Sequence, residues 1–199
     1  DTIFSPFSDI SQLFFLTGKT GWIINFKGRI ARTADGGSTW EILPNLSQNG
    51  WQVNITAIFF SDEKNGWIAT TAQIMHTNDG GISWIPQYSL QANNAYCFFF
   101  FNESIGWTVG GDGLILKTTN GGEEWLKQIK ITSNALSQVF FVNENIGWIV
   151  GSNSTLLRTT NGGITSVDVK VEQPIPSDVS LSQNYPNPFN PETIISYKV

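Results

Sequence analysis

The stretch GWTVGGDGLILKTTNGGEEW, residues 106–125, decides the fold, because the sequence repeats it. Related copies begin with the Gly-Trp pairs at Gly21, Gly66 and Gly147, so successive pairs are 45, 40 and 41 residues apart. A period of about forty residues is typical of repeat proteins, in which each unit packs against its neighbours. We therefore interpret these residues first as parts of a scaffold and only then as candidates for function.

Each repeat contains four short strand-forming segments separated by turn residues. An apolar run comes first, and a Phe lies six residues before each Gly-Trp pair: Phe15, Phe60, Phe100 and Phe141. Four short strands per unit and no helical periodicity are typical of a β-propeller blade. We predict an all-β fold with four four-stranded blades over residues 1–171, which can stack as an open arc of a larger propeller. The repeats lie near 10–53, 54–93, 94–134 and 135–171.

The most specific local feature is the tight turn between the third and fourth segments of each repeat. An Asp or Asn side chain there can accept hydrogen bonds from backbone N–H groups just downstream, and glycine supplies the positive φ. The closing Trp then has a fixed place to pack between units. The turn positions are Thr33, Asp35, Gly37 and Trp40; Thr77, Asp79, Gly81 and Trp84; Thr118, Asn120, Gly122 and Trp125; and Thr159, Asn161 and Gly163.

These turns resemble the Asp-box, or bacterial neuraminidase repeat, with the pattern S/T-x-D-x-G-x-T-W. The third copy departs from it at Asn120 and Glu124, and the fourth has Ser166 in place of Trp. The loss of that Trp predicts a terminal blade. Together with the Gly-Trp strands, residues 10–168 are similar to the repeats of photosystem II stability and assembly factors and of secreted bacterial proteins built from the same blades. The resemblance implies a propeller that usually has six or more blades.

Composition argues against several classes of function. The 199 residues carry a formal net charge of −5, so the chain lacks the basic surface that nucleic acid requires. No apolar run approaches the ~18 residues of a membrane helix, and we expect no transmembrane segment. The single cysteine, Cys97, has no disulfide partner in this sequence, and the single histidine, His76, rules out a multi-histidine metal site. We expect no metal and no cofactor.

Charged residues recur at two positions of the repeat. One set directly precedes the turn Thr, and the other lies three residues after the repeat's Phe. The resemblance to assembly factors implies that basic residues on the propeller contact partners, so the first set is a candidate surface for an acidic partner. Because both positions recur in the scaffold, we predict instead that both sets are solvated. They are Arg32, His76, Lys117 and Arg158, and Glu63, Glu103 and Glu144.

Candidate binding residues lie where the copies differ, on the face opposite the tight turns. Trp51 is the only tryptophan outside the repeat frame, and with Tyr88 it could form an aromatic and amide surface that stacks a sugar or holds a peptide. Alternatively, Trp51 covers the gap between the first two blades. The candidate ligand-binding residues are Trp51, Tyr88, Gln48, Asn49, Gln87, Asn93, Asn94, Arg29, Asp112 and Asn153.

The sequence does not support catalysis within these residues. A sialidase-like site needs three converging arginines, but two of the three present, Arg29 and Arg32, share one strand and its approach. On the expected face, Asp112 has no evident second carboxylate at the ~5 to 10 Å that glycoside hydrolysis needs. We expect a non-catalytic propeller that binds a protein or glycan. The alternatives are a secreted glycoside hydrolase whose catalytic residues lie outside this sequence, and an assembly-factor-like scaffold for a membrane protein complex.

The composition changes near the C-terminal end. Residues 172–180 are rich in Pro, Ser and acidic residues, which predicts an extended linker. The next motif consists of Tyr185, Pro186, Asn187, Pro188, Phe189, Asn190 and Pro191. It resembles the opening of the type A C-terminal sorting domain of type IX secretion. The resemblance implies that residues 181–199 are the truncated start of an immunoglobulin-like sandwich, including its first strand. It also implies that secretion machinery is a partner and that the protein is secreted or displayed at the cell surface.

Overall fold

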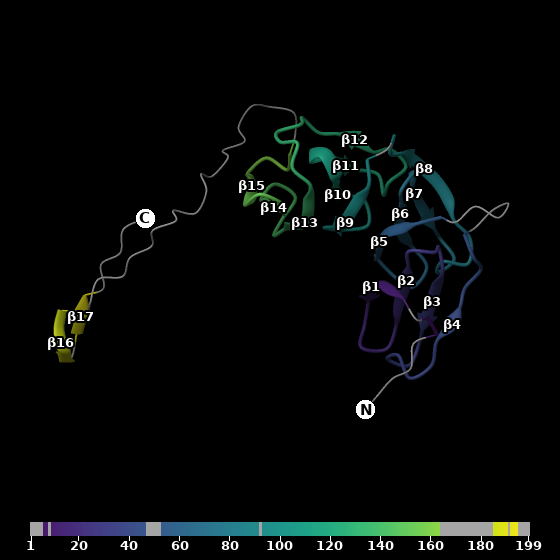
Figure 1. The fold of residues 1–199 in the computed structure, drawn as a ribbon, viewed down its shortest axis with the longest axis horizontal. Coiled ribbons are helices and arrows are strands. Elements are labelled where there is room, and N and C mark those ends of the chain that lie inside the picture. The colour runs from purple at the N-terminus through teal and green to yellow at the C-terminus, as the bar shows by residue number, and fades with distance from the viewer. Residues whose placement is uncertain are drawn as a thin grey trace.

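Four antiparallel sheets follow one another along an arc (Figure 1). The computed structural model describes residues 6–7, 9–46, 53–91, 93–163, 185–190 and 192–194 of the chain. In Figure 1 the arc runs from the purple N-terminal sheet to the green fourth sheet. The prediction of an all-β propeller segment built from four successive blades is confirmed.

Three of the sheets have the four strands predicted for a blade, always in sequence order. Blade 1 contains β1 (Ile10–Phe15), β2 (Gly21–Asn25), β3 (Ile30–Thr33) and β4 (Glu41–Ile42). Blade 2 contains β5 (Ile55–Phe60), β6 (Gly66–Thr70), β7 (Gln73–Thr77) and β8 (Ile85–Ser89). Blade 3 contains β9 (Ala95–Phe100), β10 (Gly106–Gly110), β11 (Ile115–Thr118) and β12 (Leu126–Lys127), with a 3-10 turn at Gly111–Gly113.

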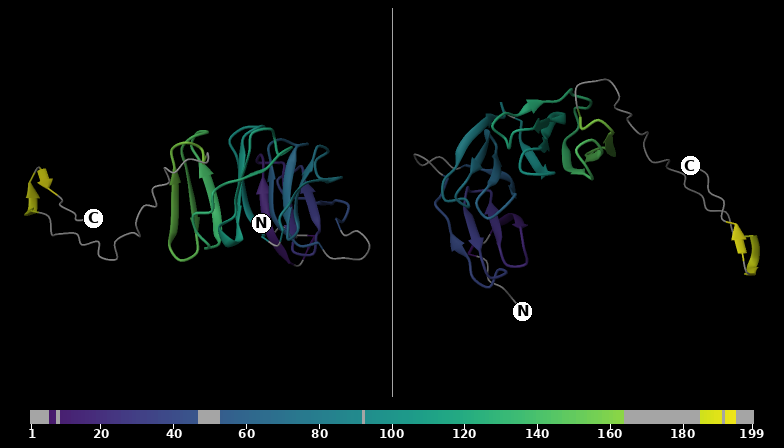
Figure 2. Two further views of the ribbon diagram at one scale, coloured as in Figure 1. Left: turned by 90° about the horizontal axis from the view of Figure 1, so that it is seen from above. Right: turned by 180° about the vertical axis from the view of Figure 1, so that it is seen from behind.

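Blade 4 contains three described strands, β13 (Leu136–Phe141), β14 (Gly147–Gly151) and β15 (Thr155–Thr159). The fourth strand expected for this blade would follow Gly163, outside the described residues. The first strands of successive blades lie side by side, with β5 against β1, β9 against β5 and β13 against β9. These first strands form the inner rim of the arc (Figure 1). The view from above shows that the strands of all four blades run roughly perpendicular to the plane of the arc (Figure 2).

Successive blades are joined by a tryptophan of one blade that stacks on a phenylalanine of the next. Trp107 of blade 3 stacks on Phe141 of blade 4, with ring centroids 3.6 Å apart and planes 12° from parallel. Stacked aromatic pairs add about 0.5–1.5 kcal/mol beyond the burial of their area. The same contact joins Trp22 to Phe60 at 3.7 Å and Trp67 to Phe100 at 4.0 Å.

Steric crowding explains why each Gly-Trp pair begins with glycine. A Cβ added to Gly106 would lie 2.5 Å from the ring of Phe100, the Phe six residues earlier in the same blade. One face of the Phe100 ring therefore lies against Gly106. The other face stacks on Trp67 of the preceding blade. The recurring six-residue spacing is explained by this three-layer contact.

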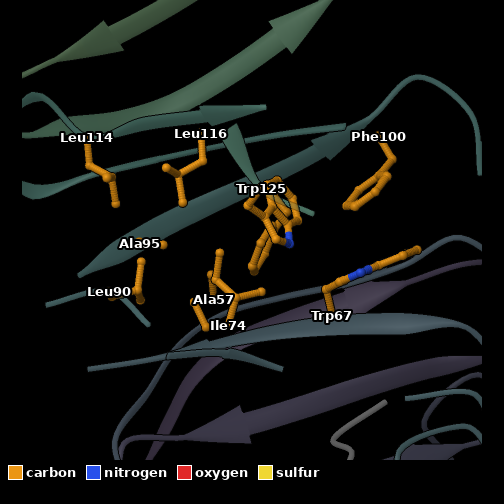
Figure 3. Close-up of a cluster of buried hydrophobic side chains, with 11 residues drawn as sticks. Ala57, Trp67, Ile74, Leu90, Ala95, Phe100, Leu114, Leu116 and Trp125 are labelled. Carbon is orange, nitrogen blue, oxygen red and sulfur yellow. The ribbon is translucent and has the colours of Figure 1, made fainter. Parts of the chain in front are cut away.

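The hydrophobic core is divided among the interfaces between blades. Figure 3 shows the core between blades 2 and 3, where Ala57 and Ile74 of blade 2 meet Leu116 of blade 3. The closing Trp125 packs in the same core, edge-on to Phe100 at 5.9 Å between centroids. Trp84 packs likewise against the core between blades 1 and 2, whereas Trp40 packs against Ile23 and Ala31 of its own blade, so the predicted packing between units holds for two of the three closing tryptophans.

The tight turns form as the sequence predicts. In the first copy, Asp35 Oδ1 accepts the Thr39 N–H at 2.9 Å, and Thr33 Oγ1 accepts the Gly37 N–H at 2.8 Å. Gly36 and Gly37 have φ of 75° and 90°, the region that favours glycine. The corresponding bonds recur in the second and third copies. We refer to these segments as the box turns.

The C-terminal motif forms a separate two-stranded sheet. Strand β16 (Tyr185–Asn190) pairs antiparallel with β17 (Glu192–Ile194), so that Tyr185 lies opposite Ile194. The sequence analysis expected one strand within residues 181–199, whereas the structure has two, the first of which coincides with the proline motif. The linker at 172–180 lies outside the described residues, as do Pro191 and the remainder of the expected sandwich.

Candidate functional site

Three predicted binding residues lie in equivalent turns. Arg29, Asp112 and Asn153 occupy the connections β2–β3, β10–β11 and β14–β15, so they share one end of the blades, as predicted. Asp112 and Asn153 have φ of 52°, in the left-handed region where Asp and Asn are enriched. Turn geometry therefore explains part of their residue type.

Asp112 and Asn153 contact two residues that the sequence analysis did not single out. Lys130 Nζ lies 2.6 Å from Asp112 Oδ1, and Asn153 Nδ2 donates to Asn134 Oδ1 at 2.9 Å. Lys130 and Asn134 belong to the connection between blades 3 and 4, which the sequence rule for this face would have included. Together they form a polar surface at this end of the two blades.

Asn93, Asn94 and Tyr88 lie where blade 2 passes into blade 3. The backbone carbonyl of Asn94 accepts the Gly111 N–H at 2.8 Å, which places Asn94 beside the Asp112 turn. Asn93 donates its own N–H to a backbone carbonyl in the same connection. Tyr88 packs against the core between blades 2 and 3, so part of its ring is a packing surface.

Gln87 lies apart from this group. Its Oε1 accepts the Trp125 indole N–H at 3.5 Å, and it lines a cavity together with Glu103 and Asn120 on the box-turn face. The prediction that Gln87 belongs to the opposite face is wrong, because its side chain reaches across to the box turn of the next blade. Gln48, Asn49 and Trp51 lie outside the described residues.

A groove follows the inner rim of the arc at the ends of the first strands. Its volume is about 660 Å³. Phenylalanines at the ends of the first strands line it, but Phe60 and Phe100 are themselves buried, and polar residues that follow β9 form its edge. The lining residues are Phe14, Phe15, Leu16, Phe59, Phe60, Ser61, Phe100, Phe101, Asn102, Glu103 and Ser104.

The row of basic residues is not simply solvated, contrary to the prediction. The Arg32 guanidinium carbon lies 5.5 Å from the centroid of the Trp22 ring, and Arg32 Nη2 is 3.4 Å from a carboxylate oxygen of Glu63 in the next blade. Lys117 is placed similarly over Trp107, and burial lowers its pKa while Glu144 opposes that shift. These cations bridge blades because their repeat position faces the next blade's loop.

Among the residues described, no three or more His, Cys, Asp or Glu side chains are grouped so that they could hold a metal ion. No described helix is long and apolar enough to cross a membrane. Burial raises the pKa of the Cys97 thiol, and that side chain packs in the core between blades 3 and 4.

The stacked blades and their box turns define a β-propeller repeat protein. More narrowly, the chain belongs to the family described as photosynthesis system II assembly factor YCF48, whose model matches residues 5–91, 45–134 and 87–187. No curated protein sequence matches the chain.

Solved structures show the same fold. A YCF48 structure bound to a D1 peptide is 17% identical, with a TM-score of 0.55 over 82% of this chain and 69% of that one. YCF48 from Cyanidioschyzon merolae is 13% identical, with a TM-score of 0.62 over 92% and 65%. An ancestral GH74 enzyme is 15% identical, with a TM-score of 0.65 over 83% and 25%. The chain thus spans about two thirds of the YCF48 structures and a quarter of the GH74 enzyme.

Proposed function

We propose that this chain is an exported, non-catalytic β-propeller that binds a partner protein. The observation that carries the proposal is the inner-rim groove of about 660 Å³. At its edge Phe101 is 43% exposed. Exposed aromatic surface beside a groove with a polar edge is typical of a site that a ligand covers.

Membership of the YCF48 family supports a protein ligand. One YCF48 structure holds a D1 peptide, which favours a peptide over a glycan as the ligand class for this chain. The groove offers the exposed Phe15 and Phe101 for apolar side chains of a partner, and Asn102 and Ser104 for its polar groups. The partner proposed for the groove is a protein segment with exposed apolar side chains.

The non-catalytic part of the proposal rests on carboxylate chemistry. Asp112 and Asp9, carboxylates at the end of the blades opposite the box turns, lie in separate exposed ion pairs, with Lys130 Nζ at 2.6 Å and Lys27 Nζ at 3.0 Å. An acid and a base for glycoside hydrolysis require two carboxylates flanking one bond. A panel of polysaccharides should therefore remain intact with the full-length protein, and turnover of any of them would contradict this part.

The exported location rests on the resemblance of residues 185–191 to the type IX sorting motif. We expect a reporter fused to the complete C-terminal module to reach the medium or the cell surface of a host with type IX secretion. Retention of the reporter inside the cell would remove this part of the proposal, and with it the secretion machinery as a partner.

Selection of peptides from a displayed library on the immobilised chain tests the groove. Phe101→Ala is expected to weaken capture of the selected peptides by at least about tenfold, the effect of losing one aromatic anchor. The matched control is Phe26→Ala, because Phe26 is 59% exposed but lies in the β2–β3 turn. Equal capture of the selected peptides by the Phe101→Ala and Phe26→Ala proteins would refute the groove as the binding site.

A glycan array with the same proteins separates the other ligand class. Glycan binding that is lost in Trp51→Ala would place the ligand at the opposite face instead and would contradict the protein-binding proposal. We expect no glycan signal.

A further inference from the structure

A basic side chain of blade 1 fills the space between blades 1 and 2. Arg32 of blade 1 lies over the Trp22 ring and reaches Glu63 of blade 2. A Cβ added to Gly80, in the box turn of blade 2, would lie 3.2 Å from Arg32 Nη1, so the guanidinium fills the space beside this turn. The Trp22 indole N–H donates to the Gly80 carbonyl at 3.0 Å.

The interface between blades 3 and 4 is closed in the same way. Lys117 Nζ lies 5.2 Å from the centroid of the Trp107 ring and donates to the Gly162 carbonyl at 3.0 Å. The Trp107 indole N–H donates to the same carbonyl at 3.2 Å. Each of these interfaces therefore has a basic side chain and an indole N–H directed at the next blade.

The interface between blades 2 and 3 lacks both contacts. His76 takes the position of the cation, and its ring centroid lies 4.9 Å from that of Trp67. Burial lowers the pKa of His76, an effect that Asp62 opposes, so burial favours the neutral imidazole. The Trp67 side chain is 2% exposed, and its fully buried indole N–H has no partner among the described residues.

A cavity remains where the cation would be. Its volume is about 350 Å³, and its lining includes Trp67, His76, Gln87, Glu103, Gly121 and Glu123. Within 4 Å, a Cβ added to Gly121 would meet only the Glu103 carbonyl, whereas its counterparts Gly80 and Gly162 meet Arg32 and Lys117. Neither Glu103 nor Glu123 forms a salt bridge within the described part of the chain. We call this cavity the blade 2–3 slot.

We propose that the blade 2–3 slot binds a basic side chain, arginine or lysine, of the partner protein. The inserted cation takes the place that Arg32 and Lys117 take at the neighbouring interfaces, next to Gly121 and the carboxylates of Glu103 and Glu123. Guanidinium and ammonium groups donate hydrogen bonds to carboxylate and carbonyl oxygens. The inference deepens the proposed protein-binding function, on which it rests for the identity of the ligand.

The remaining polar group of the slot suits the same ligand. The Trp67 indole N–H requires an acceptor, which a basic side chain does not have. A peptide that carries the basic side chain also carries backbone carbonyl oxygens. The ligand is therefore a peptide segment with a basic residue, and a free ammonium ion satisfies only part of the slot.

An NMR titration of the full chain tests the slot with Ac-Gly-Gly-Arg-Gly-Gly-amide as the probe. Because Glu103 and Glu123 are exposed, the expected dissociation constant is on the order of 1 mM. We expect the Trp67 indole N–H resonance to shift in a saturable way. The same peptide with citrulline, which is neutral but similar in shape, is expected to bind at least about tenfold more weakly.

Two substitutions separate the slot from other acidic surface. Glu103→Gln should weaken the arginine peptide at least about tenfold, whereas Glu41→Gln, an exposed carboxylate in β4, should leave it unchanged. His76→Arg restores the side chain type found at the first interface, so it should fill the slot, abolish binding and raise the melting temperature. Unaltered binding in a folded His76→Arg protein would overturn the inference, and so would equal affinity for the citrulline peptide.

Failure of the slot and failure of the groove give different results. If peptides selected on the groove still bind the His76→Arg variant while the arginine probe does not bind the wild type, the slot is refuted and protein binding stands. If the arginine probe binds through Glu103 while Phe101→Ala has no effect on selected peptides, the groove is refuted and the slot stands.

Discussion

Truncation of Trp107 tests whether the blades are held together by their stacked tryptophans. The side chain is 1% exposed, stacks on Phe141 and donates its indole N–H to the Gly162 carbonyl. Removing a buried aromatic side chain costs about 3–5 kcal/mol, and the lost hydrogen bond adds about 1 kcal/mol. We therefore expect Trp107→Ala to lower the free energy of unfolding by about 4–6 kcal/mol, against a total of about 5–15 kcal/mol for a whole domain.

The loss should be local, because repeat proteins are stabilised by contacts between nearest neighbours. Blade 4 should unfold before blades 1–3. Urea unfolding followed by circular dichroism measures the total loss of stability, and hydrogen exchange of the amides in β13 to β15 detects the early unfolding of blade 4. The matched control is Trp148→Ala. Trp148 has the same repeat position, but no described aromatic ring stacks on it, and Arg158 lies 5.9 Å from its ring centroid. We expect that variant to lose no more than about 1 kcal/mol; equal losses in both variants would refute the reasoning.

Three further predictions concern other parts of the scaffold. Hydrogen bonds from the hydroxyl four residues downstream hold the pKa of Asp35 and of Asp79 at about 2, below the unfolded value of about 3.9. The stability they provide is present above about pH 4 and lost as the pH falls towards 2, so the acid-induced drop in melting temperature should shrink in a double Asp→Asn variant; an unchanged profile would contradict this. Gly66→Ala places a Cβ 2.5 Å from an aromatic ring and should cost about 1–3 kcal/mol, whereas Gly18→Ala, with nothing within 4 Å, should be nearly neutral; equal melting temperatures would count against the three-layer contact. Burial and the raised pKa of Cys97 should make its alkylation at pH 7.5 much slower in the folded protein than in urea, and equal rates would disprove its burial.

The scaffold could be predicted from the sequence because each feature recurs in register. The box turns depend on local hydrogen bonds within a few residues, and these form as expected around Asp35 and Asn120. The six-residue spacing between Phe100 and Gly106 was also apparent from the sequence. Its physical reason, a ring enclosed between a glycine and the next tryptophan, required the packing of two blades.

The cation row shows where prediction from one repeat fails. Recurrence identified Arg32 and Lys117 as equivalent, but their partners lie in the following blade. A signal was present in the sequence: Lys117 precedes Glu144 by 27 residues, and His76 precedes Glu103 by the same interval. Comparison of these pairs across blades would have indicated contacts between blades and would have singled out His76 as the exception.

The binding face was predicted only in part. The position of Asp112 and Asn153 follows from strand order, which the repeat determines. Gln87 was misplaced because strand order gives the position of a backbone and not the reach of a long side chain. That Trp51 lies on this face and binds a ligand stays a prediction.

The most direct test of the blade 2–3 slot is the number of arginine pentapeptides bound per chain, measured by NMR titration of the slot resonances and confirmed by equilibrium dialysis. Wild type should bind one peptide, and His76→Arg should bind none. Lys117→His should open space beside Gly162 and Glu144, but the Trp107 indole N–H already donates to the Gly162 carbonyl and the sequence has Ile164 at the repeat position of Glu123, so a folded variant should still bind one peptide. Binding of the peptide to a folded His76→Arg protein, or no binding to the wild type, would contradict the account.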